Sequence, residues 1–395
     1  GEGFGPLGEF ISGWSYWLSA WLGNIAFATM LMSSIGTFIP TFKGGQNVPS
    51  IIVAIIFCWL LTILVNNGVE SATFVNMIGT ICKIVPLIIF IIIMFVCFKG
   101  GMFTADFWGK VASNATKGTT TGSVWTQMKG TLMTLIWVFI GIEGASVMAH
   151  RAKSRSEAEQ ASVISFILLV IIYVLISILP YGALTRAQLA GMGQPALGHV
   201  LEMTVGHWGA VLINVGLIIS TIVSWLSWTM LPAETTMLVA DDKAMPKAWG
   251  KVNSKNAPTT SLMITGVLQT IFLFSLLFTE KAYEFAYSLC AAAILFSYLF
   301  VGLYQMKLSS ERKEWGQYTV GLLSALFMFA CMFLAGWQEV LLVTISFIPG
   351  FCVYYAGCKE NNHKFSKAEL WTMGLILVLS VVAIVLVFNG TITIS

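Results

Sequence analysis

Long apolar runs separated by short polar loops make up most of this chain of 395 residues. About 20 apolar residues in a helix cross the hydrocarbon core of a bilayer, which is about 30 Å thick. The apolar runs are Glu9–Ile39, Val48–Val65, Ser71–Phe98, Val124–Met148, Ala161–Tyr181, Trp208–Ala240, Thr260–Phe278, Ala282–Met306, Tyr318–Ala335, Val340–Tyr355 and Leu370–Phe388. This pattern predicts an all-α integral membrane protein with about eleven transmembrane helices.

The composition agrees with a membrane protein and argues against several other classes. Hydrophobic residues make up 57% of the chain and charged residues only 10%, whereas soluble domains contain about 25% charged residues. No basic stripe is long enough for a nucleic-acid interface, so we expect no nucleic-acid partner. The seven cysteines have no C-x-x-C spacing, so we interpret them as packed thiols and expect no metal and no cofactor. No nucleophile–base pair or phosphate-binding loop is recognisable, and we expect that the protein is not an enzyme.

Lysine and arginine are unevenly distributed between alternate loops. The loops after the fourth, sixth, eighth and tenth runs contain 13 of these residues, and the remaining loops and run edges contain 7. In membrane proteins the excess of positive residues lies in the cytoplasmic loops. The pattern therefore predicts that Gly1 is cytoplasmic and Ser395 is outside.

The segment Trp137–Ser146 interrupts the fourth run with a carboxylate between two glycines. Gly141 and Gly144 flank Glu143. Glycine destabilises a helix by about 1 kcal/mol relative to alanine, and a charged residue at membrane depth costs about 2.5–3.5 kcal/mol on insertion scales. Together these features predict a broken helix with a functional acid at the break, beside a cavity. The alternative is a kinked structural helix whose glutamate is satisfied by a neighbouring group.

A second ionisable residue, Lys83, lies well inside the third run, fifteen residues before Phe98. That distance is too long for its ammonium group to reach the membrane surface. A buried lysine needs carbonyl groups, a carboxylate or water around it. We interpret Lys83 as a fixed or titrating positive charge in the place of a bound cation. Glu234 follows Pro232 near the end of its run, where a solvated, structural role is the simpler interpretation.

Aromatic residues inside the runs are candidates for binding an organic cation. Trp137 and Trp228 each lie well inside a run, among small or polar neighbours. Indole faces attract cations by about 0.5–2 kcal/mol, and plain packing is an equally good explanation for both residues. Tyr16 and Asn24 are eight residues apart and lie near one face of their helix. Tyr298 lies in the middle of the eighth run.

Four motifs spread along the chain give a resemblance to a known family. They are Gly-Trp-Ser-Tyr-Trp-Leu-Ser-Ala-Trp-Leu-Gly-Asn at Gly13–Asn24, Leu-Ile-Trp-Val-Phe-Ile-Gly-Ile-Glu-Gly-Ala at Leu135–Ala145, Leu-Ser-Trp-Thr at Leu226–Thr229 and Ala-Pro-Thr at Ala257–Thr259. With these motifs the sequence resembles the amino acid–polyamine–organocation superfamily of transporters. Within it, the sequence most resembles the bacterial arginine/ornithine antiporters of the basic amino acid/polyamine antiporter branch.

The resemblance implies the inverted-repeat (LeuT-like) transporter fold, with two five-helix repeats and broken helices that meet at the substrate. The first run here resembles the third helix of the family. Residues 9–98 then correspond to the remainder of the first repeat, residues 124–306 to the second, and residues 318–389 to peripheral helices, all within one membrane domain of residues 1–395. The first two family helices have no counterpart in this chain. One of them normally carries the turn that holds the substrate carboxylate, so that half of the site stays unassigned.

The resemblance also assigns substrate-binding roles to residues of this chain. Trp137 resembles the aromatic that stacks on the substrate cation and gates it, and Trp228 the aromatic along the middle of the pathway. The carbonyl groups around the break are expected to hold the substrate α-ammonium. Related exchangers carry serine at the position of Cys290. The substrate-binding candidates are Trp137, Ile140, Gly141, Trp228, Asn24 and Cys290.

Further roles implied by the resemblance concern gating and ion coupling. Tyr16, Glu143 and Tyr298 resemble an outer gate. Lys83 resembles a lysine of the fifth family helix that stands in for a sodium ion in several relatives.

The function implied is exchange of cationic amino acids by alternating access, with arginine and ornithine as the expected partners. The expected location is the cytoplasmic membrane of a bacterium, with the lipid bilayer as the surroundings. Histidine/histamine or lysine/cadaverine exchange on the same fold remains an alternative, as does a non-transporting sensor or a truncated remnant. The sequence leaves open whether the chain forms a homodimer.

Overall fold

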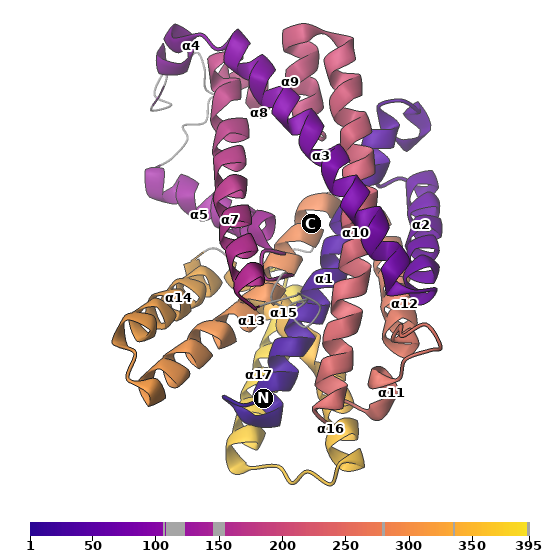
Figure 1. Ribbon diagram of the computed structural model, residues 1–395, viewed down its shortest axis with the longest axis vertical. Coiled ribbons are helices and arrows are strands. Elements are labelled where there is room, and N and C mark those ends of the chain that lie inside the picture. The colour runs from indigo at the N-terminus through magenta and orange to yellow at the C-terminus, as the bar shows by residue number, and fades with distance from the viewer. Residues whose placement is uncertain (106, 108–122, 145–154, 279–280, 335, 393–395) are drawn as a thin grey trace.

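The computed structural model describes residues 1–105, 107, 123–144, 155–278, 281–334 and 336–392. Every regular element within these ranges is helical (Figure 1), which confirms the predicted all-α class. The end of the fourth run, residues 145–148, and the basic loop that follows it up to residue 154 lie outside the described residues.

Nine of the described helices are long and apolar enough to cross a membrane, and a bent pair brings the number to ten. The nine are α1 (Gly5–Gly36), α2 (Val48–Asn66), α3 (Val69–Cys97), α7 (Arg155–Ile178), α10 (His207–Asp241), α12 (Thr259–Ser275), α13 (Ala282–Arg312), α14 (Trp315–Leu334) and α17 (Lys367–Phe388). The pair, α15 (Trp337–Ile345) and α16 (Phe347–Glu360), is bent by 44°. The fourth predicted run differs from the rest, because its helix α5 (Val124–Phe139) ends early.

Short helices connect the long ones. They are η1 (Pro40–Phe42), α4 (Gly100–Ala105), η5 (Leu179–Gly182), α8 (Arg186–Ala190), α9 (Ala196–Val205), α11 (Lys247–Gly250) and η6 (Leu276–Phe278).

Polar caps explain where several long helices begin. The side chain of Asn47 accepts a hydrogen bond from the backbone N–H of Ser50 at the start of α2. At the start of α17, Ser366 and Glu369 form a reciprocal capping box. Such caps satisfy backbone N–H groups that have no partner within the helix. They fix the boundary between loop and membrane helix.

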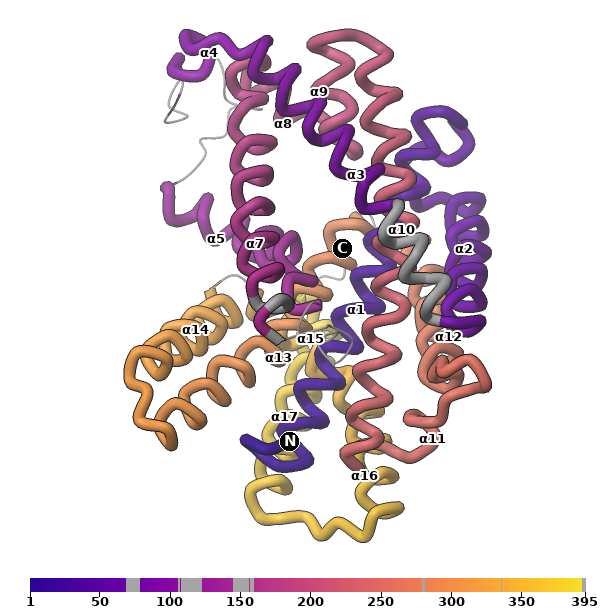
Figure 2. The backbone as a smooth tube through the Cα atoms, viewed as in Figure 1, coloured from indigo at the N-terminus to yellow at the C-terminus, as the bar shows by residue number. Residues whose placement is uncertain are grey.

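Helix α1 lies at the centre of the molecule and packs along α10 and α13 (Figure 2). Large side chains on α1 are fully buried, among them Phe10, Trp17 and Ile25. Close approach depends on small residues: a Cβ atom on Gly13 would lie 2.5 Å from a methyl carbon of Val239 on α10. Membrane helices pack mainly through such small-residue contacts, because lipid supplies no hydrophobic driving force between them. Three helices are therefore held around one side of the candidate site.

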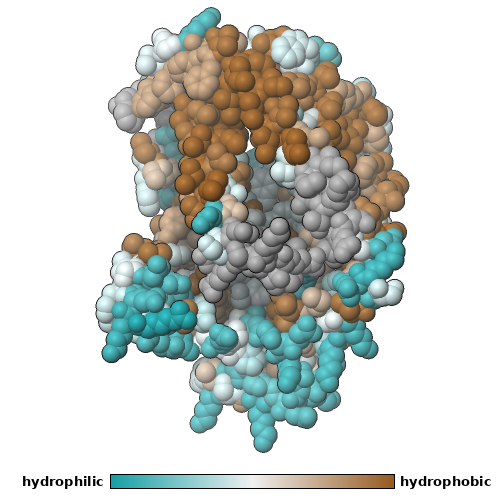
Figure 3. All heavy atoms as spheres, in the orientation of Figure 1, coloured by the Kyte–Doolittle hydropathy of each residue, from teal (hydrophilic) through white to brown (hydrophobic). Residues whose placement is uncertain are grey.

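The surface has an apolar region and a polar end. In Figure 3 hydrophobic side chains cover the upper part of the face shown, and hydrophilic side chains gather at the lower end. The amino terminus lies toward that lower end, where α16 connects to α17 (Figure 1). Exposed leucine, isoleucine and valine side chains line the outer helices, as in Ile167 and Ile171 of α7 and Val381 of α17. Exposed apolar side chains over several helices are expected where a protein faces lipid.

Candidate functional site

The helix break predicted around Gly141 is present in the structure. Helix α5 ends at Phe139, and Ile140 is extended with φ −63° and ψ 133°. Gly141 has φ +110°, a conformation that residues with a side chain rarely adopt. A Cβ atom on Gly141 would also lie only 3.1 Å from Cζ2 of Trp228. Glycine is therefore needed here both for the backbone turn and for the approach of the indole ring.

The carboxylate of Glu143 folds back onto this break. Its Oε2 atom accepts hydrogen bonds from the N–H of Gly141 at 2.9 Å and from the hydroxyl of Tyr298 at 2.7 Å. Hydrogen bonds to a charged group each contribute about 1.5–3 kcal/mol, which offsets the cost of removing the carboxylate from water. The Glu143–Tyr298 bond joins the break to α13, a helix 155 residues later in the chain.

Two polar atoms beside this bond are buried without a hydrogen-bond partner in the described part of the chain. They are the Oε1 atom of Glu143 and the hydroxyl of Tyr16. The Tyr16 hydroxyl lies close to the same carboxylate. Buried polar atoms are normally hydrogen-bonded. Glu143, Tyr298 and Tyr16 therefore form one polar cluster at the helix break.

A cavity of about 470 Å³ lies between α1, α3, α5, α7, α10 and α13. This volume is within the range of sites for small molecules. The cavity wall contains six residues singled out from the sequence: Lys83, Trp137, Ile140, Gly141, Trp228 and Cys290. Asn24 and the three gating candidates Tyr16, Glu143 and Tyr298 do not line it.

Trp137 belongs to an aromatic cluster that sequence reasoning did not identify. Its ring centroid lies 5.4 Å from that of Tyr287, 5.9 Å from Tyr283 and 6.1 Å from Phe27. Phe27 also lines the cavity, one helical turn after Gly23. This spacing on α1 is the one signal that could have identified it. The three rings pack against the indole, which itself lines the cavity.

Helix α7 supplies a further part of the cavity wall that the sequence analysis missed. Tyr173 lines the cavity, and its hydroxyl donates a hydrogen bond of 2.9 Å to the carbonyl of Val138. This carbonyl is near the end of α5, where the last turn has no helical N–H partners. The carbonyl of Gly141 accepts from the N–H of Gly144 at 3.0 Å. The break is thus held by contacts from α7 and α13.

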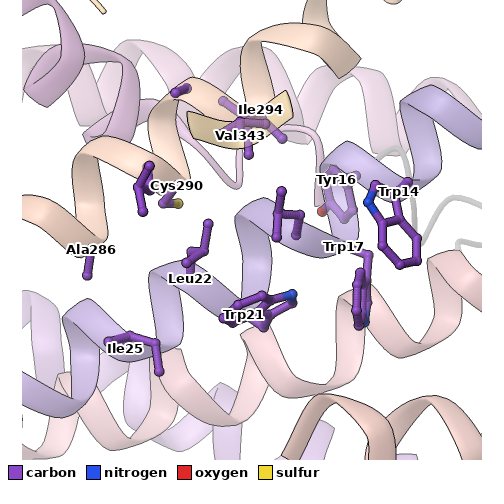
Figure 4. Packing of buried hydrophobic residues seen from close by; sticks show 14 of the residues in the cluster. Trp14, Tyr16, Trp17, Trp21, Leu22, Ile25, Ala286, Cys290, Ile294 and Val343 are labelled. Carbon is purple, nitrogen blue, oxygen red and sulfur yellow. The ribbon is translucent and has the colours of Figure 1, made fainter. Parts of the chain in front are cut away.

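Cys290 lies on α13 opposite α1. Its sulfur is 3.4 Å from the hydroxyl oxygen of Ser19, and a Cβ atom on Gly23 would lie 3.3 Å from it. Figure 4 shows Cys290 among buried side chains, near Leu22 of α1. The thiol forms part of the cavity wall between α1 and α13.

Lys83 reaches the cavity from α3. The residue is half-buried, and it makes no salt bridge within the described ranges of the chain. It lines the cavity from α3, on the wall that also contains residues of the helix break.

The gating candidates lie on one side of the cavity. Tyr16 precedes Gly23 by seven residues, which is about 10 Å toward the start of α1. Tyr298 follows Cys290 by eight residues, which is about 12 Å toward the end of α13. These two helix ends are adjacent, since Nζ of Lys307 donates to the carbonyl of Gly3 at 2.7 Å. The three residues therefore lie on the side of the amino terminus. If the amino terminus is cytoplasmic, a gate on the same side faces the cytoplasm. The outer gate and the cytoplasmic amino terminus that were expected from the sequence therefore cannot both be correct.

Comparisons with known proteins give consistent matches along the chain. A family model described as amino acid permease matches residues 1–358. An arginine/ornithine antiporter of Latilactobacillus sakei is 47% identical, and the alignment covers 100% of this chain and 83% of that protein. An arginine/ornithine antiporter of Lactococcus lactis is 42% identical, covering 98% of this chain and 76% of that protein. An arginine/agmatine antiporter of Chlamydia felis is 37% identical, covering 98% and 81%.

Proposed function

Because the chain belongs to the amino acid permease family, we propose that it exchanges arginine for ornithine across a membrane by alternating access. The observation that carries this proposal is the pair of arginine/ornithine antiporters that match 98–100% of the chain at 42–47% identity. The arginine/agmatine antiporter is less similar, at 37%. Histidine/histamine and lysine/cadaverine exchange are less well supported than arginine/ornithine exchange.

The cavity has groups that suit both substrates. Arginine and ornithine each carry an α-ammonium group and a cationic side chain. The carboxyl end of α5 has a partial negative charge from its helix dipole, which favours an ammonium group near Ile140 and Gly141. The indole faces of Trp137 and Trp228 attract the cationic side chain. In this proposal the substrate lies along the cavity wall between the break and these two rings.

The Glu143–Tyr298 hydrogen bond is proposed to keep the cavity closed on the side of the amino terminus. It joins the break to α13, and Tyr16 of α1 lies beside the same carboxylate. Breaking it would let the helices on this side separate during the rocking motion of alternating access. We place this gate at the cytoplasmic side, since the positive-inside pattern puts Gly1 in the cytoplasm of a bacterial cell and Ser395 outside. The proposed gate is therefore an inner one.

Exchange of equally charged substrates moves no net charge, so it needs no ion gradient. Lys83 fits this scheme, because a fixed positive charge in the cavity wall replaces a bound sodium ion.

A competition experiment tests the substrate assignment. Proteoliposomes containing the complete gene product and loaded with ornithine take up labelled arginine while unlabelled ornithine, agmatine, lysine, cadaverine, histidine or histamine is added outside. We expect ornithine to compete most strongly among these. Stronger competition by agmatine, or by either of the other pairs, would move the assignment to that pair.

A further inference from the structure

Three lysines surround a small cavity at the polar end of the molecule. They are Lys243, Lys247 and Lys251, and the cavity has a volume of about 260 Å³. It lies where the end of α10 meets α11 and the end of α16 (Figure 1). Sites for drug-sized molecules measure about 300–1,000 Å³, so this cavity suits one compact polar group.

The ammonium groups of these lysines have no carboxylate partner. None of the three forms a salt bridge in the part of the chain that the structure describes. The wall contains one carboxylate, Asp241, so three positive groups stand against one negative group. Two carboxylates nearby are engaged elsewhere: Glu360 accepts a hydrogen bond of 2.9 Å from the backbone N–H of Lys247, and Asp242 interacts with Glu9 of α1. The cavity therefore has an excess of positive charge that an anion can neutralise.

The backbone around the lysines is held in place by α16. Lys243 has φ +70°, a conformation uncommon for a residue with a side chain. Its carbonyl accepts a hydrogen bond of 3.3 Å from Nδ2 of Asn361. A Cβ atom on Gly357 of α16 would lie only 2.6 Å from the carbonyl carbon of Met245, so the two segments pack backbone against backbone. The lysines are therefore attached to a packed turn and not to a free loop.

Exposed apolar side chains adjoin the cavity. Leu238, one helical turn before Asp241 on α10, is 46% exposed, and Val252, which follows Lys251, is exposed to the same extent. Such side chains at the end of a membrane helix are expected to contact lipid, while the long stems of lysines carry their charges to the headgroups. Lysine clusters directly beside a membrane helix attract anionic headgroups. The surroundings of the cavity therefore favour a lipid over a soluble anion.

We propose that the cavity between Lys243, Lys247 and Lys251 binds the phosphate of an anionic phospholipid headgroup, with the acyl chains against Leu238 and Val252. Lysine binds phosphate as a compact point charge. The site shares no wall residue with the substrate cavity, so its occupation does not depend on which amino acids are exchanged. A soluble phosphate would use the same lysines, and the experiment separates the two sources.

The test measures lipid binding to the complete gene product by native mass spectrometry, in mixtures of phosphatidylglycerol and phosphatidylcholine. We expect the wild type to retain phosphatidylglycerol preferentially, and no preference would overturn the proposal. Each lysine beside a membrane surface contributes about fivefold to binding. Lys247→Gln combined with Lys251→Gln should therefore lower the binding constant for phosphatidylglycerol by roughly 25-fold. Lys247→Arg combined with Lys251→Arg keeps both charges and should stay within about threefold of the wild type.

Lys364→Gln combined with Lys367→Gln is the matched control. Both lysines are exposed, lie at the same end of the molecule between α16 and α17, and do not line the cavity. This pair removes the same total charge but should lower the binding constant by less than about threefold, because exposed charges away from the phosphate are screened by salt. An equal loss in both glutamine pairs would show diffuse attraction and contradict a specific site.

Inorganic phosphate distinguishes the two sources of the anion. In the absence of anionic lipid, labelled inorganic phosphate should show no saturable binding that depends on Lys247 and Lys251. Saturable binding that is lost in the glutamine pair, with displacement of phosphatidylglycerol, would assign the site to a soluble anion and overturn the lipid.

A photoreactive phosphatidylglycerol added to the wild type gives a second measurement that needs no variant. Its cross-links should fall on the peptide of residues 243–252, which contains the three lysines. Cross-links confined to other peptides would refute the site, even if the glutamine pair fails to fold.

Discussion

The hydroxyl of Tyr298 provides the sharpest test of the proposed inner gate. Tyr298→Phe removes one oxygen and leaves the ring in place. The lost bond, 2.7 Å to Oε2 of Glu143, has a charged acceptor and contributes about 1.5–3 kcal/mol. Since 1.4 kcal/mol corresponds to a factor of ten, the closed state should become roughly 10- to 100-fold less favoured. Glu143 keeps its bond from the N–H of Gly141, so we expect a value near the lower end.

Cys290 can report the opening of this gate. Its thiol lines the cavity beyond the three gating residues, so a membrane-impermeant, positively charged thiol reagent must pass the gate to reach it from the side of the amino terminus. Labelling of Cys290, followed by mass spectrometry of its peptide, should be roughly tenfold faster in Tyr298→Phe, because reagent access follows the population of the open state. Arginine added on the same side should slow the labelling.

Tyr304→Phe is the matched control for this experiment. Tyr304 lies on the same helix and donates a comparable hydrogen bond of 2.9 Å to Glu2, but that bond is exposed to solvent. Its loss should not change the labelling rate. Equal labelling of Cys290 in the wild type, Tyr298→Phe and Tyr304→Phe would refute the gate.

Three further predictions concern the cavity and the break. Trp137→Leu should weaken the apparent affinity for arginine by about 1–2 kcal/mol, with Trp137→Phe intermediate; the exposed Trp125→Leu on the same helix is the control, and unchanged exchange in both Trp137 variants would exclude cation stacking. Lys83→Ala should insert normally but lose exchange, while wild-type exchange should not depend on sodium; sodium-dependent uptake by the wild type would contradict this role. Glu143→Gln should be mild and Glu143→Ala severe if the carboxylate mainly accepts the two hydrogen bonds, whereas a loss already in Glu143→Gln that shrinks with added salt would show attraction of the cation; normal rates in both would refute a functional role.

The elements that the sequence predicts well are those set by local chemistry. Apolar runs give the membrane helices to within a few residues, because capping residues such as Asn47 and Ser366 end the loops. The break in α5 is likewise local, since two glycines around a carboxylate weaken that helix wherever it packs. Predicting a single run at Val340–Tyr355 missed the bend between α15 and α16.

The contacts across helices could not be predicted, because they depend on how each helix is rotated against its neighbours. Only the family resemblance groups Tyr298 with Glu143, and no residue pattern shows the hydrogen bond between them. Nothing in the sequence predicts that Tyr283 and Tyr287 pack against Trp137. Asn24 is a clear case. Its position next to substrate was expected, but its partner is a backbone carbonyl, and backbone groups are not visible as a sequence motif. The side of the cavity on which the gate lies also required the direction of α1 and α13.

Coupled movement of the two substrates tests the central proposal most directly. Proteoliposomes containing the complete gene product are loaded with one isotope of ornithine and placed in arginine labelled with another, and both labels are followed over time. Arginine uptake and ornithine release should be equal, should need substrate on both sides, and should not respond to an imposed membrane potential or sodium gradient. Uptake of arginine into liposomes without internal substrate, or release of ornithine without external substrate at the same rate, would contradict an exchanger.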